Sequence, residues 1–575
     1  MSEARENIYT AGERADVRVH LPDGRVFAAP RGTPVYDVFR TAFPDRTDPP
    51  MAAVIAGKLR DLSWPLERDA DVNPVRCCDS MGSRIYARAL SFLLVAVVYQ
   101  LFANARLHVA YSVPYGGYFC RILGRDPLTK QELGAVEGRM RELIDAGMPV
   151  RHGKRPLGDI AGLLESRGES STLRLLQDCG FEWAHVHSIN GYDGVFHGIM
   201  PTTLGDLRVW GLEPLSDGFV LRFPTSRDPS TLQPRQEFRE LRNVFSEYGQ
   251  WLTLLGLHDV GSLNRSIRDG SIEEVILVSE ALHERKTIEI ATSIAKRHRD
   301  GVRIVLIAGP SASGKTTFSK RLSIQLLVQG LRPFPLSMDD YFHPRDWLYQ
   351  KLGDEMDFDA VSALDVDRLR SDLVRLVAGE SVALPQFDFH TGKRSDGPVV
   401  RLEPDHILLV EGIHALNPTL LDEEMADTCF RVFVSALTQL NLDIHNRIST
   451  TDTRLLRRIV RDAYTRDHSA RETIEMWPNV RRGEAENIFP YQENVDAMFN
   501  SALVYELAAL KPLAEPLLWQ IREPKVRIEA DRLLALLQWF KPCGTENVPD
   551  TSILREFVGG SNLSDFTPLA TFPDP

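Results

Sequence analysis

The sequence predicts a multidomain protein with α/β and α+β parts, and three observations lead to this prediction. The chain has 575 residues, which is too long for a single hydrophobic core. Its front part mixes short alternating strands with helices, as α+β domains do. Beyond residue 301, short β-branched runs alternate with longer amphipathic segments, the pattern of a doubly wound parallel sheet covered by helices.

Composition and charge narrow the class of protein. Hydrophobic residues make up 43% and charged residues 25%, which is ordinary for a soluble globular chain. The net charge of −12 disfavours a polyanion partner for the chain as a whole. The six cysteines form no Cys-x-x-Cys pair, which fits reduced thiols rather than a disulfide framework or a zinc site. We therefore expect a cytoplasmic protein.

The first domain is expected at residues 16–78, after an N-terminal tail of residues 1–15 that has no signal-peptide pattern. The runs "VRVHL" and "RVFAA" alternate around "PDG", which predicts a hairpin. The following "TPVYDVFRTAF" predicts a capped helix. This β-β-α order predicts a small ubiquitin-like roll.

The sequence pattern predicts an α+β domain over residues 79–230. It predicts a helical connector over residues 231–300, with Gly301 as its stop signal. The apolar run at 89–102, "ALSFLLVAVVYQLF", is shorter than the roughly 20 residues that a bilayer requires. We therefore expect a buried helix there and no membrane contact. Residues 546–575 are rich in Pro, Gly and Ser, which predicts a tail that is poorly ordered or lies along the surface.

The region at 301–545 predicts the parallel sheet. The runs "VRIVLIAG", "RPFPLSM", "HILLVEG" and "RVFVSA" predict buried strands, and helical patterns separate them. Because parallel strands need crossover connections, this alternation places the carboxyl ends of the strands at one edge of the sheet.

The stretch "GPSASGKT" at residues 309–316 fits G-x-x-x-x-G-K-[ST] without a departure. A strand precedes it and a helix follows it, which is the context that a phosphate-binding loop requires. In such a loop the backbone N–H groups hold phosphates, Lys315 reaches the β- and γ-phosphates, and the Thr316 hydroxyl binds Mg²⁺. We expect ATP and Mg²⁺ as cofactors. The ATP-binding residues predicted from the loop are Gly309, Ser311, Ala312, Ser313, Gly314, Lys315, Thr316 and Thr317.

Two further strand ends carry acids. Glu411 follows "HILLV", where a second magnesium-binding group is expected. Asp339 and Asp340 follow "RPFPLSM", on the same rim, where a base for an alcohol acceptor belongs. The next residues, Tyr341 and Phe342, indicate an acceptor pocket rather than a simple cap.

A helical stretch at 450–467 carries five arginines. Such a run is commonly a solvated basic face, but it also fits a lid that neutralises charge on the transferring phosphoryl group. The residues are Arg454, Arg457, Arg458, Arg461 and Arg466.

These segments, in this order, resemble the uridine kinase and phosphoribulokinase branch of P-loop kinases over roughly residues 301–512. "SMDDYF" is similar to the family's Asp-Ser-Phe-Tyr segment, which implies that Asp339 is the catalytic base. "MDFDAVSALD" resembles the family's Asn-Phe-Asp-His-Pro-Asp-Ala-Phe-Asp segment, so Asp359 would hold the ribose hydroxyls. "VEGIHAL" matches the Glu-Gly-Ile segment and supports Glu411 near magnesium.

The arginine helix resembles the family's lid helix. The resemblance implies that Arg458 joins Asp359 at the ribose, with Arg461 and Arg466 as catalytic groups near the phosphates. The lid here ends "TRDHSAR" where the family has Glu-Arg-Gly-Arg, so its last arginine is displaced or absent.

The acceptor site departs from the uridine–cytidine kinases. Their Tyr-Asp-Phe-x-x-His stretch carries a tyrosine and a histidine that contact the pyrimidine. Here the stretch is "FDFHTG", with Phe387 at the tyrosine position and Gly392 at the histidine position. His390 lies two residues before the family's histidine position and is a candidate to replace that histidine. These changes leave the predicted reaction type unaltered, but they remove the residues from which the identity of the nucleobase would be predicted.

The front half resembles threonyl-tRNA synthetases. Residues 16–78 resemble their TGS domain, and residues 79 to about 225 resemble their second, editing-type domain. That editing site uses His-x-x-x-His and Cys-x-x-x-His. The aligned positions here are Arg88, Phe92, Phe196 and Met200, and a phenylalanine can neither bind metal nor move a proton. We expect the scaffold without the editing chemistry.

Together these features predict an ATP-dependent kinase for the 5′-hydroxyl of a nucleoside, such as uridine or another pyrimidine nucleoside like thymidine. Two alternatives stay open: an RNA- or ligand-binding regulator with the kinase half as a nucleotide switch, and a kinase for another small alcohol, as in the phosphoribulokinase branch. The sequence also leaves room for weak RNA contact through the front half and for a homo-oligomer.

Overall fold

The computed structural model describes residues 14–102, 105–352, 360–388, 391–420, 423–566 and 568. The chain forms two compact units. Unit 1 contains the residues up to Leu176, Gly180–Gln236 and Ile444–Asn446. Unit 2 contains Gln177–Cys179, Glu237–Asp443 and the residues from Arg447 onward. The helical segment at 237–300 therefore packs with the second half of the chain.

Unit 1 begins with a five-stranded mixed sheet in the order β2-β1-β7-β4-β5. Its elements are β1 Asp16–His20, β2 Val26–Pro30, α1 Val35–Ala42, β4 Pro50–Ile55, β5 Lys58–Arg60 and β7 Ala70–Arg76. The predicted hairpin and helix are present: β1 and β2 pair antiparallel, and β1 and β7 pair parallel. Alternate strand residues such as Val17 and Val19 meet Phe39 of α1 in a small core.

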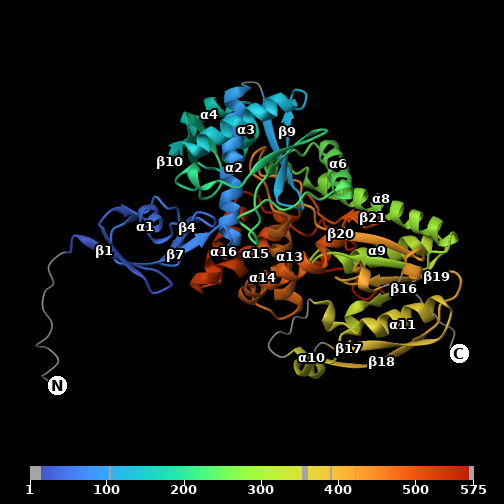
Figure 1. The fold of residues 1–575 in the computed structure, drawn as a ribbon. Coiled ribbons are helices and arrows are strands. Elements are labelled where there is room, and N and C mark those ends of the chain that lie inside the picture. Colours follow the sequence, from blue (N-terminus) through green and yellow to red (C-terminus); the bar gives the residue numbers. More distant parts are fainter. Residues whose placement is uncertain are drawn as a thin grey trace, which may run out of the picture. The chain divides into compact units, whose positions relative to one another are not determined.

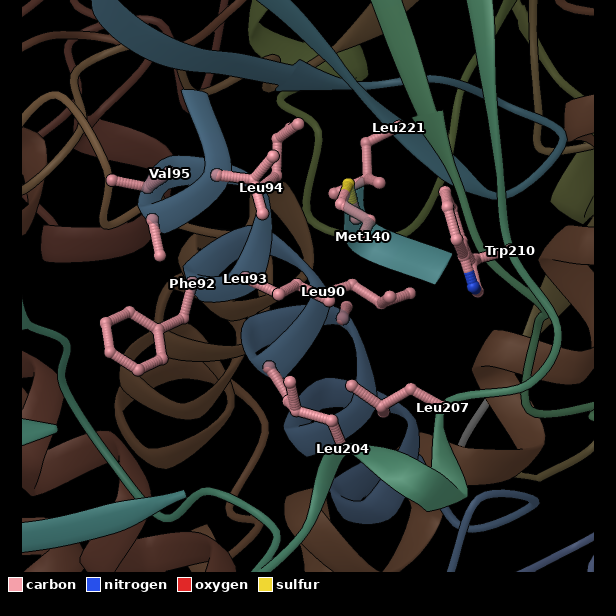
Figure 2. Packing of buried hydrophobic residues seen from close by; sticks show 14 of the residues in the cluster. Leu90, Phe92, Leu93, Leu94, Val95, Met140, Leu204, Leu207, Trp210 and Leu221 are labelled. Atoms are coloured by element: carbon pink, nitrogen blue, oxygen red, sulfur yellow. The ribbon is translucent and has the colours of Figure 1, made fainter. Parts of the chain in front are cut away.

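The rest of unit 1 is built around one apolar helix, α2, Ser80–Leu101 (Figure 1). Leu90 and Leu93 of α2 face side chains from α3, Lys130–Asp145, and from the segment around Leu204 (Figure 2). A sheet of order β13-β14-β9-β8 and a second one of order β10-β11-β12 complete the domain. Their bounds are β8 Arg106–Ser112, β9 Gly117–Leu123, β10 Arg151–Pro156, β11 Trp183–Ile189, β12 Tyr192–Val195, β13 Gly211–Leu215 and β14 Gly218–Arg222.

Helix α2 extends beyond the apolar run from which it was predicted. Its 22 residues are long and apolar enough, by length and composition, to cross a membrane. However, 78% of its most apolar 18-residue window is buried inside the protein, as expected of a core helix. The predicted buried helix is therefore present, and length alone was not sufficient to exclude a membrane span.

Unit 2 contains a five-stranded sheet in the order β16-β19-β15-β20-β21, and every neighbouring pair is parallel (Figure 1). The strands are β15 Ile304–Ala308, β16 Arg332–Ser337, β19 His406–Glu411, β20 Cys429–Ser435 and β21 Ala497–Asn500. The first four are the strands that the sequence predicts. The central strand β15 is followed in sequence by β16 and flanked by β19 and β20, so the order reverses there. In open α/β sheets this switch point is where ligands bind.

Helices and a hairpin surround this sheet. The helices are α6 Arg239–Leu254, α7 Val260–Arg268, α8 Ile272–Arg299, α9 Lys315–Val328, α10 Arg345–Leu352, α11 Val366–Val377, α12 Glu423–Ala426, α13 Thr450–Thr465, α14 Ala470–Asn487, α15 Glu506–Trp519, α16 Pro524–Leu537 and α17 Arg555–Val558. The hairpin pairs β17, Val382–Asp388, with β18, Lys393–Val400. Buried Arg321 on α9 pairs with Glu280 and Glu284 on α8, which ties the connector to the sheet unit.

Candidate active site

The phosphate loop joins β15 to α9, and its glycines are needed where they stand. A Cβ added at Gly309 would lie 2.0 Å from the carbonyl oxygen of Val434 on β20. Gly314 has φ +84°, a conformation that favours glycine, and it is the residue before the first turn of α9. The loop therefore presents its amides at the N-terminus of a 14-residue helix, where anions are stabilised.

The predicted magnesium pair is in contact. Thr316 Oγ1 donates a hydrogen bond of 3.0 Å to Glu411 Oε1 at the end of β19. Ile307 of β15 pairs with Glu411 of β19 in the parallel register. The end of β15, which leads into the phosphate loop, therefore lies beside Glu411. A magnesium ion would suit this pair because both are hard oxygen donors, and its other positions would be taken by phosphate oxygens and water. Among the residues that the structure describes, no group of three or more His, Cys, Asp or Glu side chains could hold a metal.

Charge is concentrated at this edge of the sheet. Burial raises the pKa of Glu411 to about 7; Lys315 opposes the rise, and Glu556 and Asp339 add to it. Burial also lowers the pKa of Lys315, although Glu411, Glu556 and Asp339 favour its charged form. Lys315 Nζ donates to the carbonyl oxygen of Pro310 at 3.2 Å. Lys315 thus lies within electrostatic reach of three carboxylates and of the Arg461 guanidinium, and Arg466 adds positive charge near Asp339 and Glu556.

The two aspartates after β16 have different environments. Ser337 pairs with Glu411 in the sheet, so the following turn lies at the same edge, and the Ser337 hydroxyl accepts from the Asp339 amide at 3.2 Å. Burial raises the pKa of Asp339, while Lys315 lowers it. Asp340 Oδ1 instead accepts a hydrogen bond of 3.2 Å from the backbone N–H of Phe387 on β17.

The predicted acceptor residues separate into two groups. Tyr341 is buried, and its hydroxyl donates to Asp372 on α11 at 3.2 Å, so it packs in the core. The rings of Phe342 and Phe387 lie 5.8 Å apart, tilted by 53°, next to the Asp340 contact, and Phe387 is buried. Gly392 lies in a turn with φ +67°.

Two predicted acceptor residues, Asp359 and His390, lie outside the described residues. Their roles stay predictions from the sequence.

The arginines of α13 do not form a solvated face. Arg454 makes a bidentate pair with Glu484 of α14 at 2.6 and 2.7 Å, and both side chains are almost completely buried. Arg457 pairs with buried Glu506 of α15 at 2.5 Å. Charged side chains this deeply buried are retained only when paired, so these two arginines hold the helix in place.

The other three arginines gather around Asp462. Arg458 contacts Asp462 at 3.1 Å and also donates to Ser311 Oγ of the phosphate loop at 3.0 Å. Arg461 contacts Asp462 at 2.9 Å, and Arg466 lies 3.8 Å from the same carboxylate. These are the arginines that the sequence assigns to the ribose and the phosphates, and Arg458 is the one whose hydrogen bond reaches the loop.

Two carboxylates at the loop were missed, Glu484 of α14, which accepts from the Ser311 amide at 3.0 Å, and Glu556. Glu556 of α17 accepts hydrogen bonds from Thr317 Oγ1 at 2.8 Å and from the Thr317 amide at 3.3 Å. It belongs to the segment expected to be a tail, and yet Ile553, Leu554 and Phe557 beside it are fully buried. No motif marks this glutamate. The apolar residues around it, spaced along "SILREFVGG", were the available signal.

The four positions aligned with the editing site contain no metal ligands or acid–base groups suited to that chemistry. Phe92, Phe196 and Met200 are buried, and the rings of Phe92 and Phe196 lie 5.1 Å apart. His445 stacks on Phe196 at 5.8 Å, so a residue from the second half of the chain lines this part of unit 1. Arg88 donates to the carbonyl oxygen of Ile199 at 2.8 Å.

Comparison with known proteins identifies relatives for both halves. Residues 304–507 match the model of the phosphoribulokinase / uridine kinase family. A uridine kinase of Staphylococcus haemolyticus is 33% identical over 178 residues, which are 31% of this chain and 76% of that protein. A solved structure of a possible uridine kinase from Bacillus stearothermophilus is 26% identical and covers 25% of this chain and 79% of its own, with a TM-score of 0.22.

The N-terminal half is similar to threonine–tRNA ligases. That of Paracidovorax citrulli is 29% identical over 164 residues, 28% of this chain. The chain spans about a quarter of the length of these ligases, 25% in this case. A kinase-like region and a ligase-like region are thus joined in one chain.

Proposed function

This chain belongs to the phosphoribulokinase and uridine kinase family, and we propose that it transfers the γ-phosphate of ATP to the 5′-hydroxyl of a nucleoside. One observation supports this most. The Thr316–Glu411 hydrogen bond, Lys315 and Asp339 stand together at the carboxyl edge of the sheet, next to a glycine-dependent phosphate loop. Phosphoryl transfer needs this set: a phosphate cradle, oxygen donors for magnesium and a base.

Each residue has one role in the proposed reaction. The loop amides and Lys315 hold the triphosphate, and Thr316 and Glu411 would hold Mg²⁺. Bound magnesium would neutralise charge on the phosphate oxygens. Asp339 accepts the proton of the 5′-hydroxyl as its oxygen bonds to the γ-phosphorus, while the bond from that phosphorus to the bridging oxygen of ADP breaks. Arg461 and Arg466 would counter charge that spreads over the equatorial oxygens.

For the acceptor we propose uridine or another pyrimidine nucleoside such as thymidine. The aromatic pair of Phe342 and Phe387 supports this, because half-buried Phe342 offers an aromatic ring to a base, and buried Phe387 has no hydroxyl to hydrogen-bond one. Asp359 and Arg458 are proposed to hold the ribose, and His390 to contact the base. The six free cysteines fit a reducing compartment, which supports a cytoplasmic location.

The ligase-like front half favours a second candidate function. Because it is similar to part of a tRNA-charging enzyme, it supports weak RNA contact and a regulatory role in which the kinase half acts as a nucleotide switch. The two functions differ in one readout. A switch hydrolyses or exchanges ATP without a phosphorylated small-molecule product.

A substrate panel tests the proposal. ADP release would be coupled to uridine, thymidine, cytidine, adenosine and ribulose 5-phosphate, with Lys315→Ala as the inactive variant and exposed Lys525→Ala as its matched control. We expect nucleoside-dependent ADP release in the wild type and the control only. Activity on ribulose 5-phosphate alone, or ADP release that no acceptor stimulates, would contradict the proposal.

A further inference from the structure

The C-terminal segment brings a carboxylate to the phosphate loop. We define the C-terminal strap as residues 548–566. Glu556 in the strap accepts hydrogen bonds from the hydroxyl of Thr317, at 2.8 Å, and from its amide, at 3.3 Å. Thr317 is in the first turn of α9, directly after the phosphate-binding Lys315 and Thr316. First-turn amides of a helix have no intrahelical acceptor, so an anion is their natural partner.

The strap is a packed element that holds Glu556 in position. Ile553 and Phe557 are fully buried, and Ile553 Cγ2 lies where a Cβ on Gly314 would meet it at 2.5 Å. The guanidinium of Arg457, itself paired with Glu506, stacks over the Phe557 ring at 4.9 Å. The loop glycine thus has a second reason to lack a side chain: the strap lies against it.

Further hydrogen bonds fix both ends of the strap. The Ser552 hydroxyl donates to Glu280 of α8 at 2.5 Å. Lys320 of α9 donates to the carbonyl oxygens of Leu563 and Ser564, each at 2.6 Å. Arg555 Nη2 donates to the carbonyl oxygens of Thr545 and Val548. The two contacts from Lys320 come from the same helix whose first turn binds Glu556.

A carboxylate and a phosphate cannot share the same donors without strong repulsion. Glu556 already lies within electrostatic reach of Lys315, Glu411 and Arg466, at an edge of the sheet where Asp339 adds a third acid and Arg461 another cation. A nucleotide phosphate at the first turn of α9 would add further negative charge and compete for the Thr317 amide and hydroxyl. Displacing Glu556 relieves the repulsion and frees both donors.

We propose that Glu556 is a resident anion of the phosphate loop and that nucleotide binding displaces it, so that the C-terminal strap autoinhibits the nucleotide site. The inference rests on the nucleotide site of the proposed function, but not on which alcohol accepts the phosphate. The apparent Kd for nucleotide is the intrinsic Kd divided by the fraction of molecules in which Glu556 has left the loop.

The expected effect follows from that relation. Replacing Glu556 with glutamine keeps the shape of the side chain but removes the charge that holds it at the loop. We expect Glu556→Gln to bind ADP with about tenfold lower Kd, because hydrogen bonds to charged groups contribute more than neutral ones. Glu546→Gln is the matched control. Glu546 is exposed and lies just before the strap, and its substitution removes the same charge.

The experiment measures ADP binding to the full-length chain by calorimetry, with and without Mg²⁺, for the wild type, Glu556→Gln and Glu546→Gln. Lys315→Ala, which should abolish binding, establishes that the Kd reports on the loop. We expect tighter binding in Glu556→Gln alone. An unchanged or higher Kd in a folded Glu556→Gln would overturn the proposal and assign Glu556 a supporting role in the site.

Hydrogen exchange on the wild type gives a second test that needs no variant. The amides of residues 548–566 should exchange faster when ADP is added, because displaced Glu556 loosens the strap. Slower or unchanged exchange there would contradict displacement. Neither measurement uses a nucleoside, so failure of the nucleoside panel would leave both results interpretable.

Discussion

Asp339 and Asp340 are adjacent in sequence, but their carboxylates have different surroundings. The pKa of Asp339 responds to Lys315, Asp340 and Arg466, which places it among the phosphate-site charges. Asp340 accepts from the Phe387 backbone and holds the β17 strand against the turn. The structure therefore separates a candidate base from a positioning group one residue away.

Asp339→Asn should lose turnover by about 10²–10⁴, the usual contribution of a general base, while ADP binding is kept. Asp340→Asn should have a milder effect, because the asparagine carbonyl can still accept from the Phe387 amide. The measurements are kcat and the Kd for ADP for both variants. A crippled Asp340→Asn beside an active Asp339→Asn would show that the base is assigned one residue too early.

At the proposed acceptor site, Phe387 is buried and has no hydroxyl. We expect Phe387→Tyr to raise kcat/KM for cytidine relative to uridine by about fivefold, the effect of one net hydrogen bond of about 1 kcal/mol. The histidine of the related kinases should not be restored at Gly392. With φ +67° and a Cβ only 2.8 Å from the Arg345 side chain, that turn would be strained by any side chain. A wild type that already prefers cytidine would contradict this assignment.

Helix α13 combines arginines in buried ion pairs with arginines that surround Asp462. Arg454 and Arg457 anchor the helix to α14 and α15 through buried pairs and donate to backbone carbonyls of the phosphate loop, whereas Arg458 donates to the Ser311 side chain. The spacing of these arginines along the sequence is also typical of a basic helix face exposed to solvent. What distinguishes them is the presence of Glu484 and Glu506, which lie 30 and 49 positions further on.

Arg454→Ala should lower the free energy of unfolding by about 3–5 kcal/mol, because it leaves Glu484 buried without its main partner. Arg471→Ala is the comparison. Arg471 pairs with Glu475 and Glu523 at the exposed surface, and its loss should destabilise the protein far less. Urea unfolding of both variants checks the difference. Equal, small losses would mean that the Arg454–Glu484 pair is not desolvated.

For the molecule as a whole, much of the fold of unit 2 was predictable from the sequence. The phosphate loop and four of the five sheet strands are local patterns, which a sequence carries without knowledge of tertiary contacts. The strand β21 was missed because its four residues are too short for a periodic signal. The Glu556–Thr317 contact joins residues 239 positions apart, and no local pattern encodes such a pairing.

The front half should not hydrolyse mischarged tRNA. Phe92, Phe196 and Met200 fill the aligned positions with buried apolar side chains, so the groups that would bind metal or move a proton are missing. Seryl-tRNA incubated with the purified protein should be hydrolysed no faster than in buffer alone. RNA binding without hydrolysis would fit the regulatory candidate function. Hydrolysis above the buffer rate would falsify the loss of editing chemistry.

The product formed from ATP and uridine or thymidine tests the proposed phosphoryl transfer directly. We expect mass spectrometry and ³¹P NMR to detect a nucleoside 5′-monophosphate together with one equivalent of ADP. We also expect that 5′-deoxyuridine, which lacks the acceptor hydroxyl, gives neither, and that Asp339→Asn forms the product at least about a hundredfold more slowly. Equal ADP formation with uridine and 5′-deoxyuridine, and no phosphorylated nucleoside, would contradict the proposed transfer.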